Sequence, residues 1–223
     1  MNNEEIPVDI DHVNHSVGGA GGHFFRRLLH ISMAVIPVLY YTKGEYISSI
    51  ISIPPNQLVI LICFTILSLE AIRLKFGIII IGQREYEATQ ISALAWGAFA
   101  VCLALLLTPQ EGSGMKSGLY GAPMIWGLTF VDPVMGEIKR NKQGIQAAII
   151  GGLIISFIIW IGSSFWLGTP LWIALILAPF TVLGELPRVK WIDDNATMIL
   201  VPLTILFIIA ALTAGIIRLT LLY

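Results

Sequence analysis

The sequence predicts an all-α integral membrane protein, a bundle of about seven transmembrane helices, on the strength of three observations. Hydrophobic residues make up 56% of the 223 residues and charged residues only 12%, a balance typical of a chain surrounded by lipid. Seven apolar stretches approach or exceed the length of about 18 residues that a bilayer-spanning helix needs. The charged residues gather at the ends of these stretches and in the links between them.

The predicted spans follow one another with short links. They cover residues 24–41, 58–76, 90–108, 119–138, 145–167, 170–187 and 197–221. The first span is the weakest, because it is short and begins with Arg26 and Arg27, whose charged ends have to reach the membrane interface along their aliphatic stems. Residues 1–23 are interpreted as a flexible polar cytoplasmic tail, and residues 24–223 as a single polytopic membrane domain.

Basic residues are distributed unequally between alternate links. Ten of the thirteen lysines and arginines fall on the side of the N-terminus. Because an excess of lysine and arginine marks the cytoplasmic side, the sequence predicts an N-terminus inside and, with seven spans, a C-terminus outside. Aromatic residues cluster at the predicted outer ends, as an interfacial belt does. They are Tyr40, Tyr41, Tyr46, Tyr120, Trp160, Trp166, Trp172 and Tyr223.

Three carboxylates lie near the cytoplasmic ends of predicted spans: Glu70, Asp132 and Glu185. A charged side chain at the centre of a membrane helix costs about 2.5–3.5 kcal/mol, so each of these acids is a candidate functional residue. Asp132 lies inside the apolar stretch and is followed by Pro133, which bends a helix and frees a backbone carbonyl. The acids therefore predict a polar site close to the cytoplasmic face.

The turn before the seventh span carries Asp193, Asp194 and Asn195. Carboxylate and amide oxygens are the ligands that Mg²⁺ prefers, and the start of the following helix can direct N–H groups at an anion. Helix capping is the competing interpretation, because Asp and Asn are favoured caps. We expect Asp132, Asp193 and Asp194 to bind metal, Asn195 to contact a nucleotide, and Asp132, Glu185 and Asp194 to serve catalysis.

Basic side chains close to these acids are candidates for binding a polyphosphate. Lys139, Arg140 and Lys142 follow the fourth span, where they suit a nucleotide, anionic lipid headgroups or topology setting equally well. Arg27 and His30 lie three residues apart on the first span. His30 could orient a phosphate, shuttle a proton or form a hydrogen bond to a neighbour.

Two further pairs of charged residues are weaker candidates. Glu70 and Arg73 are spaced i to i+3, which suits a local ion pair as well as a site. Arg84 and Glu85 belong to a link, where the competing interpretation is a solvated run of charges.

Taken in order, these motifs resemble the dolichol/phytol kinase family, CTP-dependent polyprenol kinases related to the phosphatidate cytidylyltransferases. The resemblance covers about residues 24–202. Its motifs are Arg26-Arg27-Leu28-Leu29-His30, Glu70-x-x-Arg73, Arg84-Glu85-x-Glu87, Asp132-Pro133-x-x-Gly136 and Glu185 with Asp193-Asp194-Asn195-x-Thr197.

The resemblance implies that CTP, with Mg²⁺, phosphorylates a long-chain isoprenoid alcohol of the dolichol, polyprenol, phytol or geranylgeraniol type. The product would be the polyprenyl monophosphate, formed at the cytoplasmic membrane face. In this family the residues matched by Asp132, Asp193 and Asp194 would hold metal and triphosphate. The expected partners are the alcohol, a nucleoside triphosphate and the bilayer, with no nucleic acid. The expected location is multi-pass, in the cell membrane or an internal membrane such as the endoplasmic reticulum.

Two other functions remain as alternatives. After Gly136 the family usually continues with Gly-Arg and then a Lys-Ser-x-Glu-Gly block, whereas this chain has Glu137 and then only Asn141-Lys142-Gln143-Gly144. The missing Lys-Ser-x-Glu-Gly block slightly raises the alternative of a CTP-dependent cytidylyltransferase acting on a lipid phosphate. A non-catalytic lipid transporter or scaffold is an alternative of another class, and both the one-sided charges and the lack of a recognisable inverted repeat argue against it.

Overall fold

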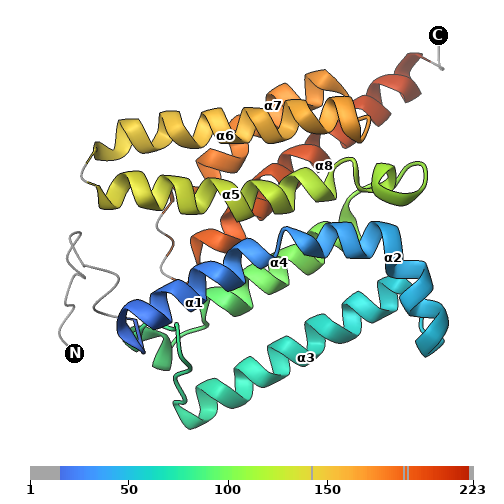
Figure 1. Ribbon diagram of the computed structural model, residues 1–223. Helices are drawn as coiled ribbons and strands as arrows, with labels where there is room; N and C mark the ends of the chain where they lie inside the picture. The colour runs from blue at the N-terminus through green and yellow to red at the C-terminus, as the bar shows by residue number, and fades with distance from the viewer. Residues whose placement is uncertain (1–15, 142, 188, 190, 221–223) are drawn as a thin grey trace.

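The computed structural model describes residues 16–141, 143–187, 189 and 191–220, with side chains described as far as residue 214. Across these residues the fold is all-helical, which confirms the all-α part of the prediction (Figure 1). The α-helices are α1 (Gly19–Ser32), α2 (Val35–Ile51), α3 (Pro55–Phe76), α4 (Ala93–Leu107), α5 (Gly121–Arg140), α6 (Gly144–Trp166), α7 (Leu171–Glu185) and α8 (Asp194–Thr220). Two short 3-10 helices are η1 (Glu85–Ala88) and η2 (Gly114–Gly118).

Three helices of the described chain are long and apolar enough to cross a membrane: α3, α6 and residues Asp194–Ala214 of α8. The helices α4 and α7 are apolar but only 15 residues long. The last turns of α5 carry four charged residues, Asp132, Glu137, Lys139 and Arg140. The structure therefore supports a membrane protein on the basis of three helices, and the predicted number of seven spans belongs to the proposal below.

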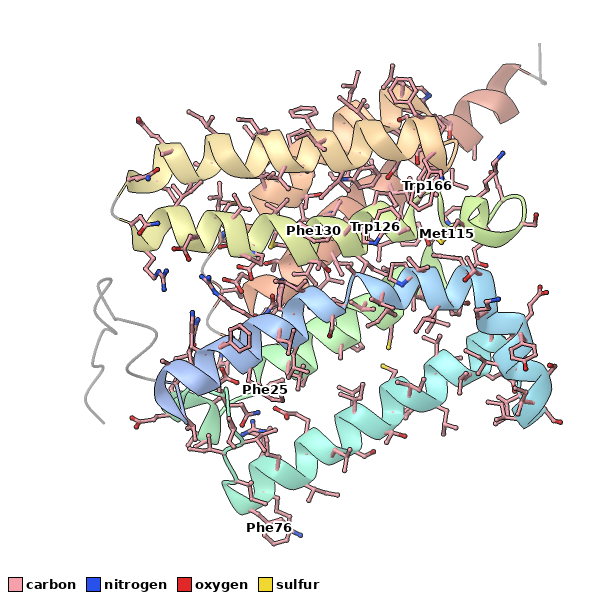
Figure 2. All side chains as sticks on the ribbon, viewed as in Figure 1. Phe25, Phe76, Met115, Trp126, Phe130 and Trp166 are labelled. Carbon is pink, nitrogen blue, oxygen red and sulfur yellow. The ribbon has the colours of Figure 1, made fainter. Side chains whose placement is uncertain are left out.

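The first predicted span differs from the structure. Instead of one helix over residues 24–41, the chain forms α1 and α2 with a break at Met33 and Ala34. The indole of Trp126 on α5 donates a hydrogen bond to the Ala34 carbonyl at 3.0 Å, which holds the break against the bundle. Trp126 also stacks on Trp166, with ring centroids 5.7 Å apart (Figure 2).

The predicted boundary at residue 23 falls inside a helix, because α1 begins at Gly19. The Val17 N–H donates to the Gln83 carbonyl at 2.9 Å, so the chain before α1 is joined to the α3–α4 link. A Cβ on Gly22 would lie 2.0 Å from the Val17 carbonyl oxygen, and this close approach requires glycine. Residues 1–15 of the predicted tail lie outside the described residues.

The core is centred on α5, which packs against α6, α7 and α8. Met124, Ile125 and Leu128 of α5 are fully buried. Glycines allow close helix crossings: a Cβ on Gly127 would lie 2.8 Å from Thr181 Cγ2 of α7, and one on Gly184 would lie 2.6 Å from Met198 Cα of α8. These crossings bring the end of α7 and the start of α8 against α5.

The aromatic belt is only partly present. Tyr46, Trp166 and Trp172 are exposed, as an interfacial position requires. Trp160 is fully buried and donates its indole N–H to Thr181 Oγ1 at 3.2 Å, and Tyr41 and Tyr120 are also buried. Bundle packing decides which way each ring faces, and sequence position does not reveal it. Tyr223 lies outside the described residues.

One end of the bundle gathers the ends of most helices. The C-terminal ends of α3, α5 and α7 meet the N-terminal ends of α1, α4, α6 and α8 at the left of Figure 1. We call it the charged end. Seven of the ten basic residues assigned to the N-terminal side lie in the described segments that form it: Arg26, Arg27, Arg73, Lys75, Arg84, Lys139 and Arg140. Lys142, Arg188 and Lys190 lie outside the described residues.

Candidate metal and phosphate site

Three carboxylates from three helices converge at the charged end: Asp132 on α5, Glu185 at the end of α7 and Asp194 at the start of α8. One oxygen from each lies within 4.8 Å of the others. Asp132 and Asp194 are half-buried, whereas Glu185 is buried. The sequence prediction named all three as catalytic, and the structure brings them together. We call them the acidic triad.

The triad has the chemistry of a hard divalent cation site. Three carboxylates so close repel one another, and Lys139 stabilises the charge of Glu185. Mg²⁺ binds oxygen at about 2.0–2.1 Å in an octahedron, which places ligand oxygens about 3–4 Å apart, so a small inward movement of the side chains would complete the site. Glu185 Oε2 is buried and has no hydrogen-bond partner among the described residues, as expected of an atom whose partner is a ligand.

Two basic side chains approach the triad from different helices. Lys139 on α5 places its Nζ 2.8 Å from Glu185 Oε1. His30 on α1 places its Nε2 3.5 Å from Asp132 Oδ2 and 3.0 Å from the Leu128 carbonyl oxygen. Both residues were predicted to bind nucleotide, and the structure places both in contact with carboxylates of the triad.

Asp193 makes the capping contact that the sequence analysis kept as the competing interpretation. Its Oδ1 accepts the Asn195 N–H at 3.1 Å, so the side chain turns back and caps α8. Glu185, rather than Asp193, is the third carboxylate of the triad. Burial, followed by the charge of adjacent Asp194, raises the pKa of Asp193 to about 7. The metal role of Asp193 stays a prediction, and sequence order alone does not show which of two adjacent carboxylates turns toward the helix backbone.

Asn195 is buried, and its Oδ1 has no hydrogen-bond partner within the described chain. The asparagine packs beside Gly97 of α4, where a Cβ would lie at an ordinary van der Waals distance of 3.6 Å from Asn195 Cβ. A buried amide oxygen without a partner is costly, so a ligand donor is the natural partner. The placement is consistent with the nucleotide contact predicted for Asn195.

The polar side chains of α1 recur at the spacing of one helix face. They are His23, Arg26, Arg27 and His30. Three of them contact acidic side chains elsewhere in the bundle. Arg26 Nη1 lies 2.7 Å from Glu87 Oε1, and Arg27 Nη2 lies 2.8 Å from Glu137 Oε2. Large apolar side chains of α1 are exposed instead: Phe24, Phe25, Leu28 and Ile31. The helix therefore directs polar groups inward and apolar groups outward (Figure 2).

Arg26 and Glu87 are the site residues that the sequence prediction missed. Glu87 is 2% exposed and accepts a hydrogen bond from the Arg26 guanidinium. The same guanidinium lies within electrostatic range of Asp193. The two residues are 61 positions apart, and no spacing rule connects them. Both residues belong to motifs of the family resemblance, and their presence in those motifs was the sequence signal that could have identified them.

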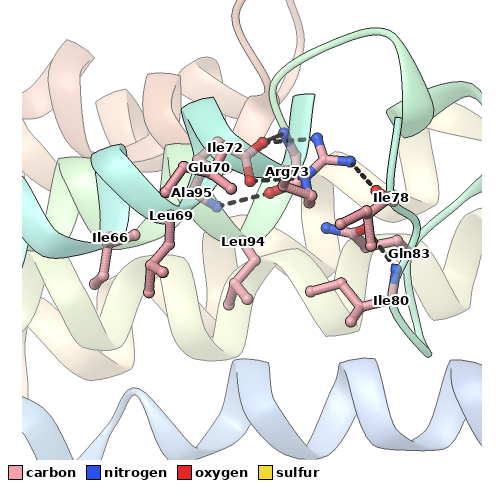
Figure 3. A pocket seen from close by; sticks show the side chains of 11 residues that line it. Ile66, Leu69, Glu70, Ile72, Arg73, Ile78, Ile80, Gln83, Leu94 and Ala95 are labelled. Atoms are coloured by element: carbon pink, nitrogen blue, oxygen red, sulfur yellow. Dashed lines mark hydrogen bonds and ion pairs between the residues drawn. The ribbon is translucent and has the colours of Figure 1, made fainter. Parts of the chain in front are cut away.

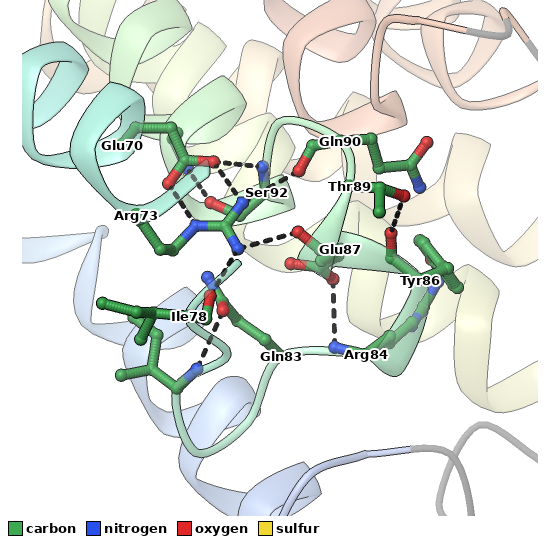
Figure 4. A network of polar contacts seen from close by, with 12 residues as sticks. Glu70, Arg73, Ile78, Gln83, Arg84, Tyr86, Glu87, Thr89, Gln90 and Ser92 are labelled. Atoms are coloured by element: carbon green, nitrogen blue, oxygen red, sulfur yellow. Dashed lines mark hydrogen bonds and ion pairs between the residues drawn. The ribbon is translucent and has the colours of Figure 1, made fainter. Parts of the chain in front are cut away.

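Glu70 and Arg73 form a closed clamp, as the ion-pair interpretation expected (Figure 4). Arg73 Nε and Nη2 donate to the two oxygens of Glu70 at 2.9 and 2.8 Å. The same guanidinium donates to the backbone carbonyls of Ile78, Glu87 and Gln90. The clamp thus holds the α3–α4 link, including Glu87, and its hydrogen bonds all run within residues 70–92.

A cavity of about 310 Å³ lies beside this clamp, between α3, α4 and the link (Figure 3). Its walls are mainly aliphatic, and they include Leu69, Ile80 and Leu94. Of the other weaker candidates, Arg84 donates to the Tyr86 hydroxyl at 2.5 Å, and Glu85 is exposed. The structure places none of these four residues in the triad. Lys142, predicted to bind nucleotide, lies outside the described residues.

Comparison of the chain with protein-family models, with curated proteins and with solved structures gave no match. The resemblance to polyprenol kinases stays a prediction, and the functional proposal below depends on the geometry of the site.

Proposed function

We propose that the protein is a Mg²⁺-dependent membrane phosphotransferase that moves the γ-phosphate of CTP to the hydroxyl of a long-chain isoprenoid alcohol. The observation that carries the proposal is the acidic triad, built from three helices and accompanied by Lys139 and His30. Phosphoryl transfer asks a protein mainly to position the reactants and neutralise charge, and carboxylate-bound metal with basic side chains supplies both. The nucleotide and alcohol are taken from the family resemblance.

Each residue has a defined task in this proposal. Asp132, Glu185 and Asp194 hold the metal ion, which when bound neutralises phosphate charge. Lys139 and His30 contact phosphate oxygens. The alcohol oxygen forms a bond to the γ-phosphorus while the bond to the β–γ bridging oxygen breaks, leaving CDP. The hydroxyl proton passes to a carboxylate, for which Asp132 and Glu185 are the candidates.

The surroundings of the site favour a lipid acceptor. Apolar side chains are exposed on the helices that carry the site, including Phe25 of α1 and Phe130 of α5 (Figure 2). A bilayer would cover these faces, and a lipid alcohol would present its hydroxyl at the interface. We place the charged end at the cytoplasmic face by the positive-inside rule, with seven spans, the N-terminus inside and the C-terminus outside.

The topology can be tested with single cysteines, after Cys63 and Cys102 are replaced by alanine. Asn141→Cys at the charged end and Lys116→Cys at the opposite end are both at exposed positions. In sealed right-side-out vesicles, an impermeant thiol reagent should label the Lys116→Cys protein, and should label the Asn141→Cys protein only after permeabilisation. Labelling of both positions from one side would contradict the topology.

The reaction can be tested with purified protein, Mg²⁺, isoprenoid alcohols and CTP carrying label in the γ-phosphate. A kinase transfers the label to the lipid. A cytidylyltransferase, given a lipid phosphate, releases the label as pyrophosphate and places label from the α-phosphate in the lipid. Absence of nucleotide-dependent product with every acceptor would favour the non-catalytic alternative. Lipid labelled from the γ-phosphate is the expected result.

The Asp194→Asn and Asp193→Asn variants should separate metal binding from capping. We expect Asp194→Asn to lose most activity because it removes a triad charge without changing side-chain volume. Asp193→Asn should retain much more activity, since asparagine is an equally good cap and keeps an acceptor for the Asn195 N–H. Initial rates at saturating Mg²⁺ and melting temperatures measure the two effects. Equal, near-wild-type activity in both variants would leave the turn with only a structural role.

A further inference from the structure

A second polar cluster lies beside the triad, where Glu137 bridges two arginines. Glu137 Oε2 lies 2.8 Å from Arg27 Nη2 of α1, and Glu137 Oε1 lies 2.5 Å from Arg140 Nη2 of α5. The Arg27 and Glu137 side chains are each 35% exposed and that of Arg140 is 50% exposed, so the bridge is open to solvent. A single carboxylate therefore faces two guanidinium groups at an accessible position.

The charge of this cluster is not balanced. Two guanidinium groups carry two positive charges and Glu137 carries one negative charge. His23, one helical turn before Arg27, has a buried Nε2 without a hydrogen-bond partner among the described residues. Arg26, Arg27, Arg84 and Arg140 all lie within electrostatic range of the His23 ring. The cluster thus has spare positive charge and an unused polar atom, both of which suit a multiply charged anion.

The polar face of α1 joins the cluster to the triad. On α1, His30 contacts Asp132, and Arg27, nearly one turn earlier, contacts Glu137. On α5, Asp132 and Glu137 are five residues apart, a rise of about 7.5 Å. Lys139, between Glu137 and Arg140, contacts the triad through Glu185. An extended polyphosphate bound at the triad would therefore pass close to Arg27 and Arg140.

We propose that Arg27 and Arg140 form a phosphate subsite. Without ligand the Glu137 carboxylate occupies this subsite, and a phosphate group displaces it on binding. Arginine binds phosphate through paired N–H donors, and a phosphate dianion matches two guanidinium charges better than one carboxylate does. For a nucleotide ligand this rests on the proposed function. A lipid phosphate headgroup would use the same chemistry.

The competing role for Glu137 is a structural link between α1 and α5, and it makes the opposite prediction. If Glu137 competes with ligand, its removal strengthens phosphate binding. If Glu137 only joins the helices and positions Arg27, its removal lets the arginine move and weakens binding. The Glu137→Gln variant, which keeps side-chain volume and removes the charge, distinguishes the two.

The experiment measures binding of inorganic tripolyphosphate to detergent-purified protein by titration calorimetry, with EDTA present so that neither metal binding nor turnover contributes. We expect Glu137→Gln to bind about two- to fivefold more tightly than wild type, the factor set by a partly exposed ion pair worth up to about 1 kcal/mol. Arg140→Gln should bind more weakly. Glu45→Gln removes the same charge from an exposed site on α2 and should bind as wild type.

A second arm titrates a short-chain phosphatidic acid in micelles, with the matching diacylglycerol as control. Tighter binding of tripolyphosphate by Glu137→Gln than by wild type supports a nucleotide phosphate as the ligand. Tighter binding of phosphatidic acid alone supports a lipid headgroup. Unchanged or weaker binding of both probes by Glu137→Gln overturns the proposal. If Glu137→Gln does not fold, the Arg140→Gln variant tests the proposal. Binding of both probes by Arg140→Gln with wild-type affinity overturns the proposal. Because no turnover is measured, failure of the kinase assay would not affect this result.

Discussion

The Asp132→Asn variant is expected to lose turnover by about 10²–10³-fold while keeping its fold. Asparagine preserves the shape of the side chain and one acceptor oxygen, but it removes a negative charge from the triad. Loss of one contact that stabilises the transition state typically costs this much in rate. Removing one of three mutually repelling carboxylates should leave thermal stability equal or higher in the absence of ligand.

The measurement pairs initial rates with melting temperatures. Mg²⁺ with CTP should raise the melting temperature of the wild type and leave that of Asp132→Asn nearly unchanged, because a ligand stabilises only the protein that binds it. Glu111→Gln, at an exposed position near the opposite end of the bundle, is the matched charge control and should behave as wild type. Full turnover, or ligand stabilisation equal to wild type, would show that Asp132 does not belong to the active site.

The largest effect on stability is expected from Arg73→Met. The guanidinium of Arg73 is buried and occupied by both oxygens of Glu70 and by three backbone carbonyls. Methionine fills similar volume but leaves the Glu70 charge and these carbonyls unpaired in a buried place. Breaking a buried ion pair by removing one partner typically costs about 3–5 kcal/mol, and thermal melting in detergent would register the loss.

Two further variants show whether the stability loss of Arg73→Met comes from the lost guanidinium geometry or from the unpaired Glu70 charge. Arg73→Lys should recover only part of the stability, because one ammonium group cannot reproduce the fork of the guanidinium. The double replacement Glu70→Met with Arg73→Met should be more stable than Arg73→Met alone, since no unpaired charge remains. If Arg73→Met melted as wild type does, the clamp would have no structural importance.

The sequence predicted helix positions well where the length and apolar character of a single segment are enough to make it a helix. The regions 58–76, 145–167 and 197–221 are long and apolar. Helices α3, α6 and α8 occupy them, the last as far as residue 220, where the described residues end. The first predicted span was different because its polar residues face a partner that lies far away in sequence. Arg26 is paired with Glu87 and Arg27 with Glu137, and the segment predicted as one short span is two helices with a break between them.

The same distinction explains the outcome at the site. Asp132, Glu185 and Asp194 were predicted individually, because a carboxylate near an apolar stretch requires an explanation. Their convergence depends on close helix crossings such as that of Gly184 against Met198, which composition does not reveal. The Glu70–Arg73 pair was recognisable from its i to i+3 spacing, which makes it a contact within one helix.

The polar-inward arrangement of α1 has a practical consequence for handling the protein. Gly22 is the one residue buried within α1 of the described structure, so little hydrophobic burial holds this helix. What remains are a few hydrogen bonds, such as those of His30 to Leu128 and of Trp126 to Ala34, together with ion pairs and the lipid that would cover the outer face. Salt weakens the ion pairs where they are exposed. Segments held in this way open at lower free energy than the core. Harsh detergent or high salt would therefore detach α1, with His30 and Arg27, while circular dichroism still reported an intact bundle.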